Sequence, residues 1–158
     1  MKPNHAAQIL HPAHTAIVVV ADAGRARLFS SPPGNTRQLD ELQDLVNPQI
    51  RVPDHAALSD RRGHVTHATA GIGHSFEPRE TQHEHAAEAF GRQLCQLLGT
   101  APYAHNIERI YLIAAPAFLG VLRQQFDPQL RSRIVLEVAS DLTRHSVADI
   151  RDVLPPVL

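Results

Sequence analysis

The chain has 158 residues, of which 43% are apolar, 20% are charged and only 4% are aromatic. A chain of this length buries roughly 68–70% of its unfolded surface, so we expect one soluble domain with its own core. With 15 Lys and Arg against 16 Asp and Glu, the formal net charge of −1 excludes a polycation that binds nucleic acid by bulk charge. The single Cys95 excludes an intramolecular disulfide framework.

Neither a membrane span nor a secretory signal is expected. A spanning helix needs about 20 mainly apolar residues, whereas the stretch from Ile110 to Leu122 is broken by Pro116 and Gly120. His11 and Pro12 interrupt the apolar region that a signal peptide would need. We therefore predict a cytoplasmic protein with no membrane partner.

The first half of the chain is typical of a flexible tail followed by three strands. Residues 1–14 lack periodicity and are interpreted as the tail, and residues 15–158 as one α/β domain. The β-branched run Ala16–Ala21 predicts a strand covered on both faces, and Arg25–Phe29 alternates as its hairpin partner. Thr36–Val46 fits a helix or a strand, and we favour a strand.

A long loop and a long helix follow. Residues 47–77 carry no apolar period, which predicts a mobile loop that is either functional or a linker. The helix after it places His83 on the apolar face, at the edge of the core, and an acidic stripe elsewhere. Pro78 suits the first helical position, whereas Thr81 and Glu84 form a capping box that would start the helix one turn later.

The second half predicts alternating strands and helices. Ile107–Ala115 and Arg133–Ala139 are buried-type strands, joined by a helix from Pro116 to Phe126. A capping box at Ser146 predicts the last helix. The order β-β-β, long loop, α-β-α-β-α predicts a single-domain mixed β-sheet with helices on its faces.

Two groups of polar residues have both a metal-binding and a structural interpretation. Asp22 and Asp141 follow strands, where carboxylates can hold a divalent cation, but we favour roles in turns and caps. Five histidines, at positions 64, 67, 74, 83 and 85, lack the spacing of a zinc motif and have no cysteine nearby. We expect no metal and no cofactor.

Catalytic signals are sparse. Cys95 has no neighbour in sequence that would lower its pKa, so we interpret it as a buried structural thiol. The segment Gly71–Ser75 is the best candidate site, because its glycines permit unusual backbone angles and His74 can exchange a proton near neutral pH. A flexible linker explains the same residues.

Four blocks of sequence resemble the bacterial host attachment protein family. They are Val20–Phe29, Ser59–Gly63, Ala114–Arg123 and Asp141–Thr143, and the resemblance runs from about Thr15 to Leu154. In the second block, Arg62 replaces the usual proline before the glycine, and His64 replaces the arginine that often follows it. This family is similar to the middle domain of archaeal and eukaryotic peptide-chain release factors and of Pelota.

The resemblance implies a ribonuclease-H-like fold and a place for a functional loop. In release factors this domain carries a Gly-Gly-Gln tripeptide just before a long helix, where it promotes peptidyl-tRNA hydrolysis. The matching place here ends in Gly71–Ser75, which has no Gly-Gly-Gln, and at best His74 stands in for the glutamine. The hydrolytic role is therefore not carried over.

Three functional hypotheses follow. The first is a non-catalytic module that binds the ribosome or RNA, with no role in DNA binding. The second is a protein-interaction factor that affects attachment to host cells indirectly. The third is a hydrolase using His74. The predicted binding residues are Arg51, Arg61, Arg62, His64, His67, Gly71, Gly73 and His74.

Overall fold

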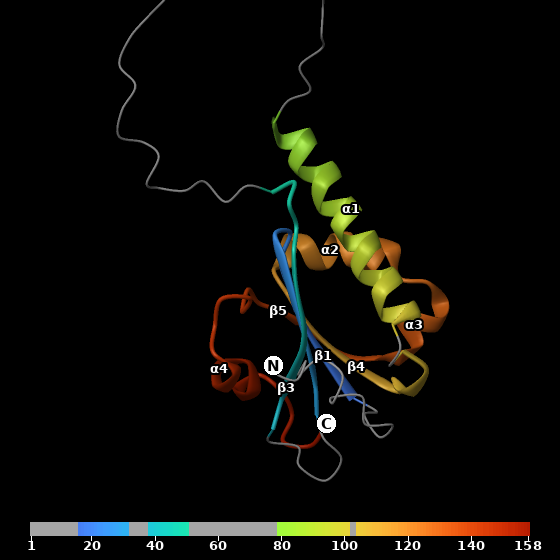
Figure 1. The fold of residues 1–158 in the computed structure, drawn as a ribbon, viewed down its shortest axis with the longest axis vertical. Helices are drawn as coiled ribbons and strands as arrows, with labels where there is room; N and C mark the ends of the chain where they lie inside the picture. Colours follow the sequence, from blue (N-terminus) through green and yellow to red (C-terminus); the bar gives the residue numbers. More distant parts are fainter. Residues whose placement is uncertain (1–15, 32–37, 51–78, 102–103) are drawn as a thin grey trace, which may run out of the picture.

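The computed structural model describes residues 16–31, 38–50, 79–101 and 104–158. The strands are β1 (Ala16–Ala21), β2 (Arg25–Ser30), β3 (Asp40–Val46), β4 (Arg109–Ala114) and β5 (Ile134–Ala139). They form one sheet in the order β3-β2-β1-β4-β5 (Figure 1). The pairs β1–β2 and β2–β3 are antiparallel, whereas β1–β4 and β4–β5 are parallel. This mixed sheet is the predicted ribonuclease-H-like architecture.

Strand β1 lies at the centre of the sheet, and all six of its residues are buried. Because side chains alternate along a strand, Ile17 and Val19 enter one core cluster and Val18 and Val20 the other. The helices α1 (Arg79–Thr100), α2 (Pro116–Gln125) and α3 (Pro128–Arg133) cover the first face, and α4 (Val147–Asp152) lies on the second (Figure 1). The continuous apolar run Ala16–Ala21 is therefore a strand of a sheet that is covered on both faces, as predicted.

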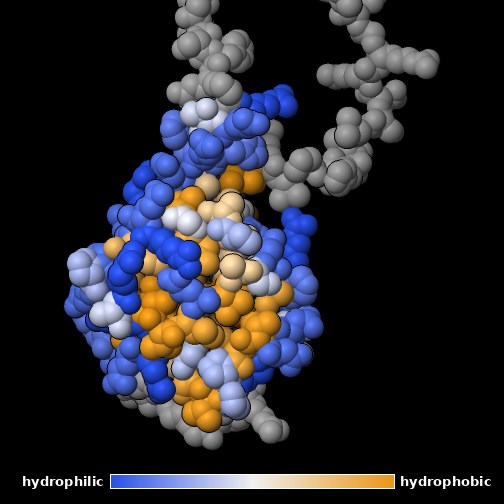
Figure 2. Space-filling model, turned by 180° about the vertical axis from the view of Figure 1, so that it is seen from behind, coloured by the Kyte–Doolittle hydropathy of each residue, from blue (hydrophilic) through white to orange (hydrophobic). Residues whose placement is uncertain are grey.

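The expectation that Arg133–Ala139 is a buried-type strand is wrong for β5. This strand pairs in parallel with β4 as predicted, but it is the edge of the sheet, and its residues alternate between partly buried and exposed. Val135 is 51% exposed there, and Val153 and Val157 near the C-terminus are exposed too. Figure 2 shows the molecule from behind, and hydrophobic residues lie in the middle of the face seen in that view. Composition alone made β5 resemble a buried strand because five of its six residues are apolar.

Helix α1 begins at Arg79, which excludes the later start at the Thr81 capping box, because Thr81 and Glu84 lie inside the helix. It packs against α2 at Gly91, where a Cβ atom would lie 3.3 Å from Val121 Cγ1 and from Gln125 Nε2. Among the described residues, no helix combines the length and the apolar character needed to cross a bilayer.

The short helices depend on their caps. The side chain of Asp127 accepts from Leu130 N at 2.6 Å and starts α3, a helix of six residues that periodicity did not predict. In α4, Ser146 and Asp149 form the predicted capping box. Ile150 and Leu154 of this region are buried, whereas Val147 is 37% exposed.

Candidate functional site

The turn between β1 and β2 is organised by Asp22. Its Oδ1 atom accepts hydrogen bonds from Gly24 N at 2.6 Å and from Arg25 N at 2.8 Å. This is the turn role that we favoured from the sequence, in which a short carboxylate bonds its own backbone. The turn lies at the carboxyl end of β1, where open α/β sheets commonly bind ligands.

The other carboxylate oxygen of Asp22 binds the loop after β5. Thr143 is fully buried, and its hydroxyl lies 2.6 Å from Asp22 Oδ2 and 3.0 Å from Asp141 Oδ1. Asp141 Oδ1 is also 3.3 Å from Thr143 N. Both aspartates therefore have structural partners, and among the described residues no group of three His, Cys, Asp or Glu could hold a metal ion.

Asn47 joins the same turn to α1. Its Nδ2 donates to Ala23 O at 2.9 Å and to Ala86 O at 3.1 Å, and its backbone N donates to Gly24 O at 2.8 Å. Only 3% of Asn47 is exposed. From the sequence, position 47 is only the start of a loop, whereas in the structure Asn47 joins the end of β3 to the β1–β2 turn and to α1.

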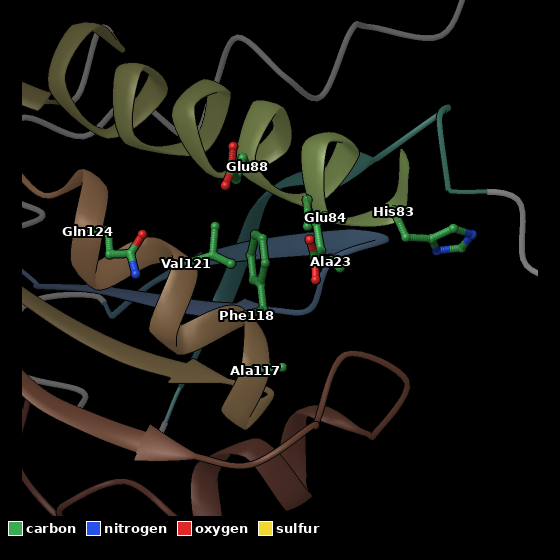
Figure 3. Close-up of a pocket in the computed structure, with 9 residues that line it drawn as sticks. Ala23, His83, Glu84, Glu88, Ala117, Phe118, Val121 and Gln124 are labelled. Atoms are coloured by element: carbon green, nitrogen blue, oxygen red, sulfur yellow. The ribbon is translucent and has the colours of Figure 1, made fainter. Parts of the chain in front are cut away.

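A cleft of about 380 Å³ lies beside this turn, between the first half of α1 and α2 (Figure 3). It exists because the two helices touch at Gly91, while the first turns of α1 extend past the sheet (Figure 1). Apolar and polar residues of three segments line it: Ala23, His83, Glu84, Ala87, Glu88, Ala117, Phe118, Val121 and Gln124. The floor is apolar, since Phe118 and Ala87 belong to the core.

The charged rim of the cleft is acidic. Glu84 and Glu88 lie one helical turn apart, and the Glu84 side chain points towards the turn that holds Ala23 (Figure 3). His83 corrects our expectation of a core-edge histidine. It is exposed, and its ring points away from the cleft, because α1 has no sheet beneath it there (Figure 3). The two carboxylates of the rim, Glu84 and Glu88, repel phosphate and attract cations.

The predicted binding residues fall outside the described part of the chain. Arg51, Arg61, Arg62, His64, His67, Gly71, Gly73 and His74 all lie in segment 51–78. Their binding roles stay predictions. The structure describes the residues on either side of this segment. Before it, Asn47 donates a hydrogen bond to Ala86 of α1, and directly after it α1 begins at Arg79.

Cys95 behaves as a structural thiol. Its side chain packs against the core cluster under α1, and burial together with the nearby Asp127 raises the pKa of the thiol to about 11. A thiol with this pKa is protonated at neutral pH and is a poor nucleophile.

The sheet order, the strand directions and the placement of the helices define an α/β domain of the ribonuclease-H-like class. The model of the family described as "Protein required for attachment to host cells" matches residues 17–154, and the chain belongs to that family. An uncharacterised protein of Rickettsia prowazekii is 28% identical over 102 residues, which is 62% of this chain and 67% of the relative.

A solved structure shares the fold. The crystal structure of an archaeal translation termination factor matches with a TM-score of 0.50 and 10% sequence identity. The match covers 89% of this chain but only 35% of that chain. At this identity the likeness concerns the fold alone. The predicted family and release-factor-like architecture are thus confirmed.

Proposed function

We propose that this chain is a non-catalytic cytoplasmic module that binds the ribosome or RNA through the arginines of segment 51–78. One observation supports this above the others: the fold is similar to that of part of an archaeal translation termination factor, and segment 51–78 directly precedes α1, the longest helix among the described residues. Arg51, Arg61 and Arg62 supply cations for phosphate, and the segment also contains four histidines.

Arginines on the sheet are less available for phosphate. Arg25 donates to Asp44 at 2.6 and 2.8 Å, and Arg27 donates to Glu41 at 2.9 and 3.0 Å. Arg123 is similarly bound to Glu137. Breaking these pairs to bind phosphate would expose a carboxylate beside the nucleic acid, so we place the phosphate-binding groups in segment 51–78.

Co-sedimentation with ribosomes at several salt concentrations tests the proposal. Replacing Arg61 and Arg62 by alanine should weaken binding and reduce the slope of log affinity against log salt by about 0.7–0.9 for each phosphate that is no longer neutralised. The matched control replaces Arg92 and Arg144, which are exposed and outside the segment. Equal binding of both double variants and the wild type at every salt would contradict the proposal.

The histidines add a pH test. Protonation of His64, His67 and His74 adds cations to the segment, so binding should strengthen between pH 7.5 and pH 6. His74→Ala should keep most of the binding. Peptidyl-tRNA hydrolysis by the wild type, abolished in His74→Ala, would favour the hydrolase hypothesis instead.

The second candidate function is a protein-interaction factor that affects attachment indirectly. The acidic rim of the α1/α2 cleft favours it, because Glu84 and Glu88 suit a cationic protein segment better than a nucleic acid.

A further inference from the structure

We propose that the α1/α2 cleft binds an arginine- or lysine-bearing segment of a partner protein. The alkyl part of one basic side chain would lie on the apolar floor, and its charged end would lie beside Glu84 and Glu88. This inference rests on the second candidate function, the protein-interaction factor, and names the partner chemistry of its site. It concerns a surface outside segment 51–78 and does not depend on binding to the ribosome or RNA.

The size and floor of the cleft suit a long side chain. A volume of about 380 Å³ falls within the range of small-ligand sites, roughly 300–1,000 Å³. Ala117 and Val121 on α2 and Ala87 on α1 present methyl groups to it. Arginine and lysine bury their methylene stems on such surfaces while keeping the charged end near water.

The two glutamates are available to a cation. Within the described residues, neither the Glu84 nor the Glu88 carboxylate has a hydrogen-bond or ion-pair partner, although exposed carboxylates elsewhere do. Asp44 and Glu41, for example, are both bound by arginines of β2. Two such carboxylates one turn apart above an apolar floor form a complementary surface for a guanidinium or ammonium group.

The shape of the cleft favours a peptide over a free amine. Ala117 and Gln124 are exposed, so the cleft opens to solvent at both of these positions along α2. An extended chain can therefore enter and leave it. The amide of Gln124 can donate to and accept from a peptide backbone, a capacity that a simple amine would not use.

The test uses fluorescence anisotropy of the full chain with a labelled peptide of alternating arginine and alanine. Replacing both Glu84, which is exposed, and Glu88, which is half-buried, by glutamine should weaken peptide binding about 2- to 30-fold, as expected for the removal of two solvent-accessible ion pairs. The matched control, Glu108→Gln with Asp152→Asn, removes the same charge from exposed sites outside the cleft and should bind as the wild type does.

A second variant tests shape without changing charge. Ala117→Phe should fill part of the cleft and weaken binding, while circular dichroism confirms that the chain remains folded. Equal binding by the wild type and the Glu84/Glu88 variant, equal weakening by the control pair, or no effect of Ala117→Phe would each overturn the proposal. Spermidine that displaces the peptide at equal charge concentration would assign the cleft to free polyamines instead. Ribosome binding, measured in parallel, should be unchanged in both cleft variants.

Discussion

Thr143 and Asp22 are separated by 121 positions in the chain, yet the Thr143 hydroxyl and Asp22 Oδ2 lie 2.6 Å apart. A hydroxyl has one hydrogen to donate, so it bonds one of the two carboxylates at a time, and the shorter contact, to Asp22, favours that partner. The contact joins the turn after β1 to the loop after β5. It also joins the first and last sequence blocks that carry the family resemblance, which gives both blocks a shared structural role.

Thr143→Val should destabilise the fold by about 1–3 kcal/mol, because it removes the hydroxyl and leaves partly buried carboxylate oxygens with fewer partners. Urea unfolding measures the change. Thr143→Ser keeps the hydroxyl and removes only a methyl group, so its cost should be smaller. If the serine variant were the less stable of the two, packing rather than hydrogen bonding would explain the role of Thr143.

An interior strand and the edge strand of the sheet should respond differently to truncation. Leu112 on β4 is 2% exposed, and Leu112→Ala should cost about 2–5 kcal/mol as a buried truncation. Val135 on β5 is half exposed, so Val135→Ala should change the free energy of unfolding by no more than about 0.5 kcal/mol. Similar costs at both positions in thermal or urea unfolding would mean that the β5 edge is covered in solution.

Two helical glycines should give stability changes of opposite sign. Gly91→Leu would force atoms into the contact with Val121 and should destabilise the protein by about 1–3 kcal/mol. A Cβ atom at Gly120 on α2 would meet nothing within 4 Å. Gly120→Ala should therefore stabilise by about 0.5–1 kcal/mol, through reduced freedom of the unfolded chain. Calorimetry on both variants checks the pair, and a stable Gly91→Leu protein would show that the helices can separate there.

The raised pKa of Cys95 predicts slow thiol chemistry and a decrease in stability in alkali. With a pKa of about 11, the folded chain should react with a disulfide reagent at pH 8 far more slowly than the same chain in denaturant. Between about pH 9 and 11 the folded state keeps a proton that the unfolded state releases, so the free energy of unfolding should fall as pH rises. Cys95→Ser removes both effects, and fast labelling of the folded wild type would contradict the assignment.

The periodic and apolar signals predicted the fold well. The run Ala16–Ala21 identified the central strand, and the Ser146–Asp149 box identified the last helix, because each pattern has one dominant physical cause. The edge position of β5 was missed, since strand order depends on contacts between distant segments and not on composition. Helix α3 was missed because six residues show no period, although Asp127 before Pro128 was a usable cap signal.

The candidate site was much less accessible to sequence reasoning. The acidic stripe of α1 was visible, but a cleft beneath Glu84 requires α2 to diverge from α1 beyond Gly91, and that crossing is a tertiary property. Thr143 and Asn47 were missed as organising residues because their partners lie far away in the chain. The predicted phosphate-binding arginines stay a prediction from sequence and resemblance.

The hydrogen bonds of the Asn47 side-chain amide bear on how the length of segment 51–78 can vary. By bonding Ala23 O and Ala86 O, it fixes the point where the chain departs towards segment 51–78 against the helix to which the chain returns. For a flexible connection whose end points are already held, each doubling of length costs only about 0.6 kcal/mol of closure entropy. On the sequence prediction that residues 47–77 form a mobile loop, we expect insertions and deletions between positions 51 and 78 to be nearly neutral for folding, so that the length of this segment can vary with its binding partner while the sheet and helices stay the same.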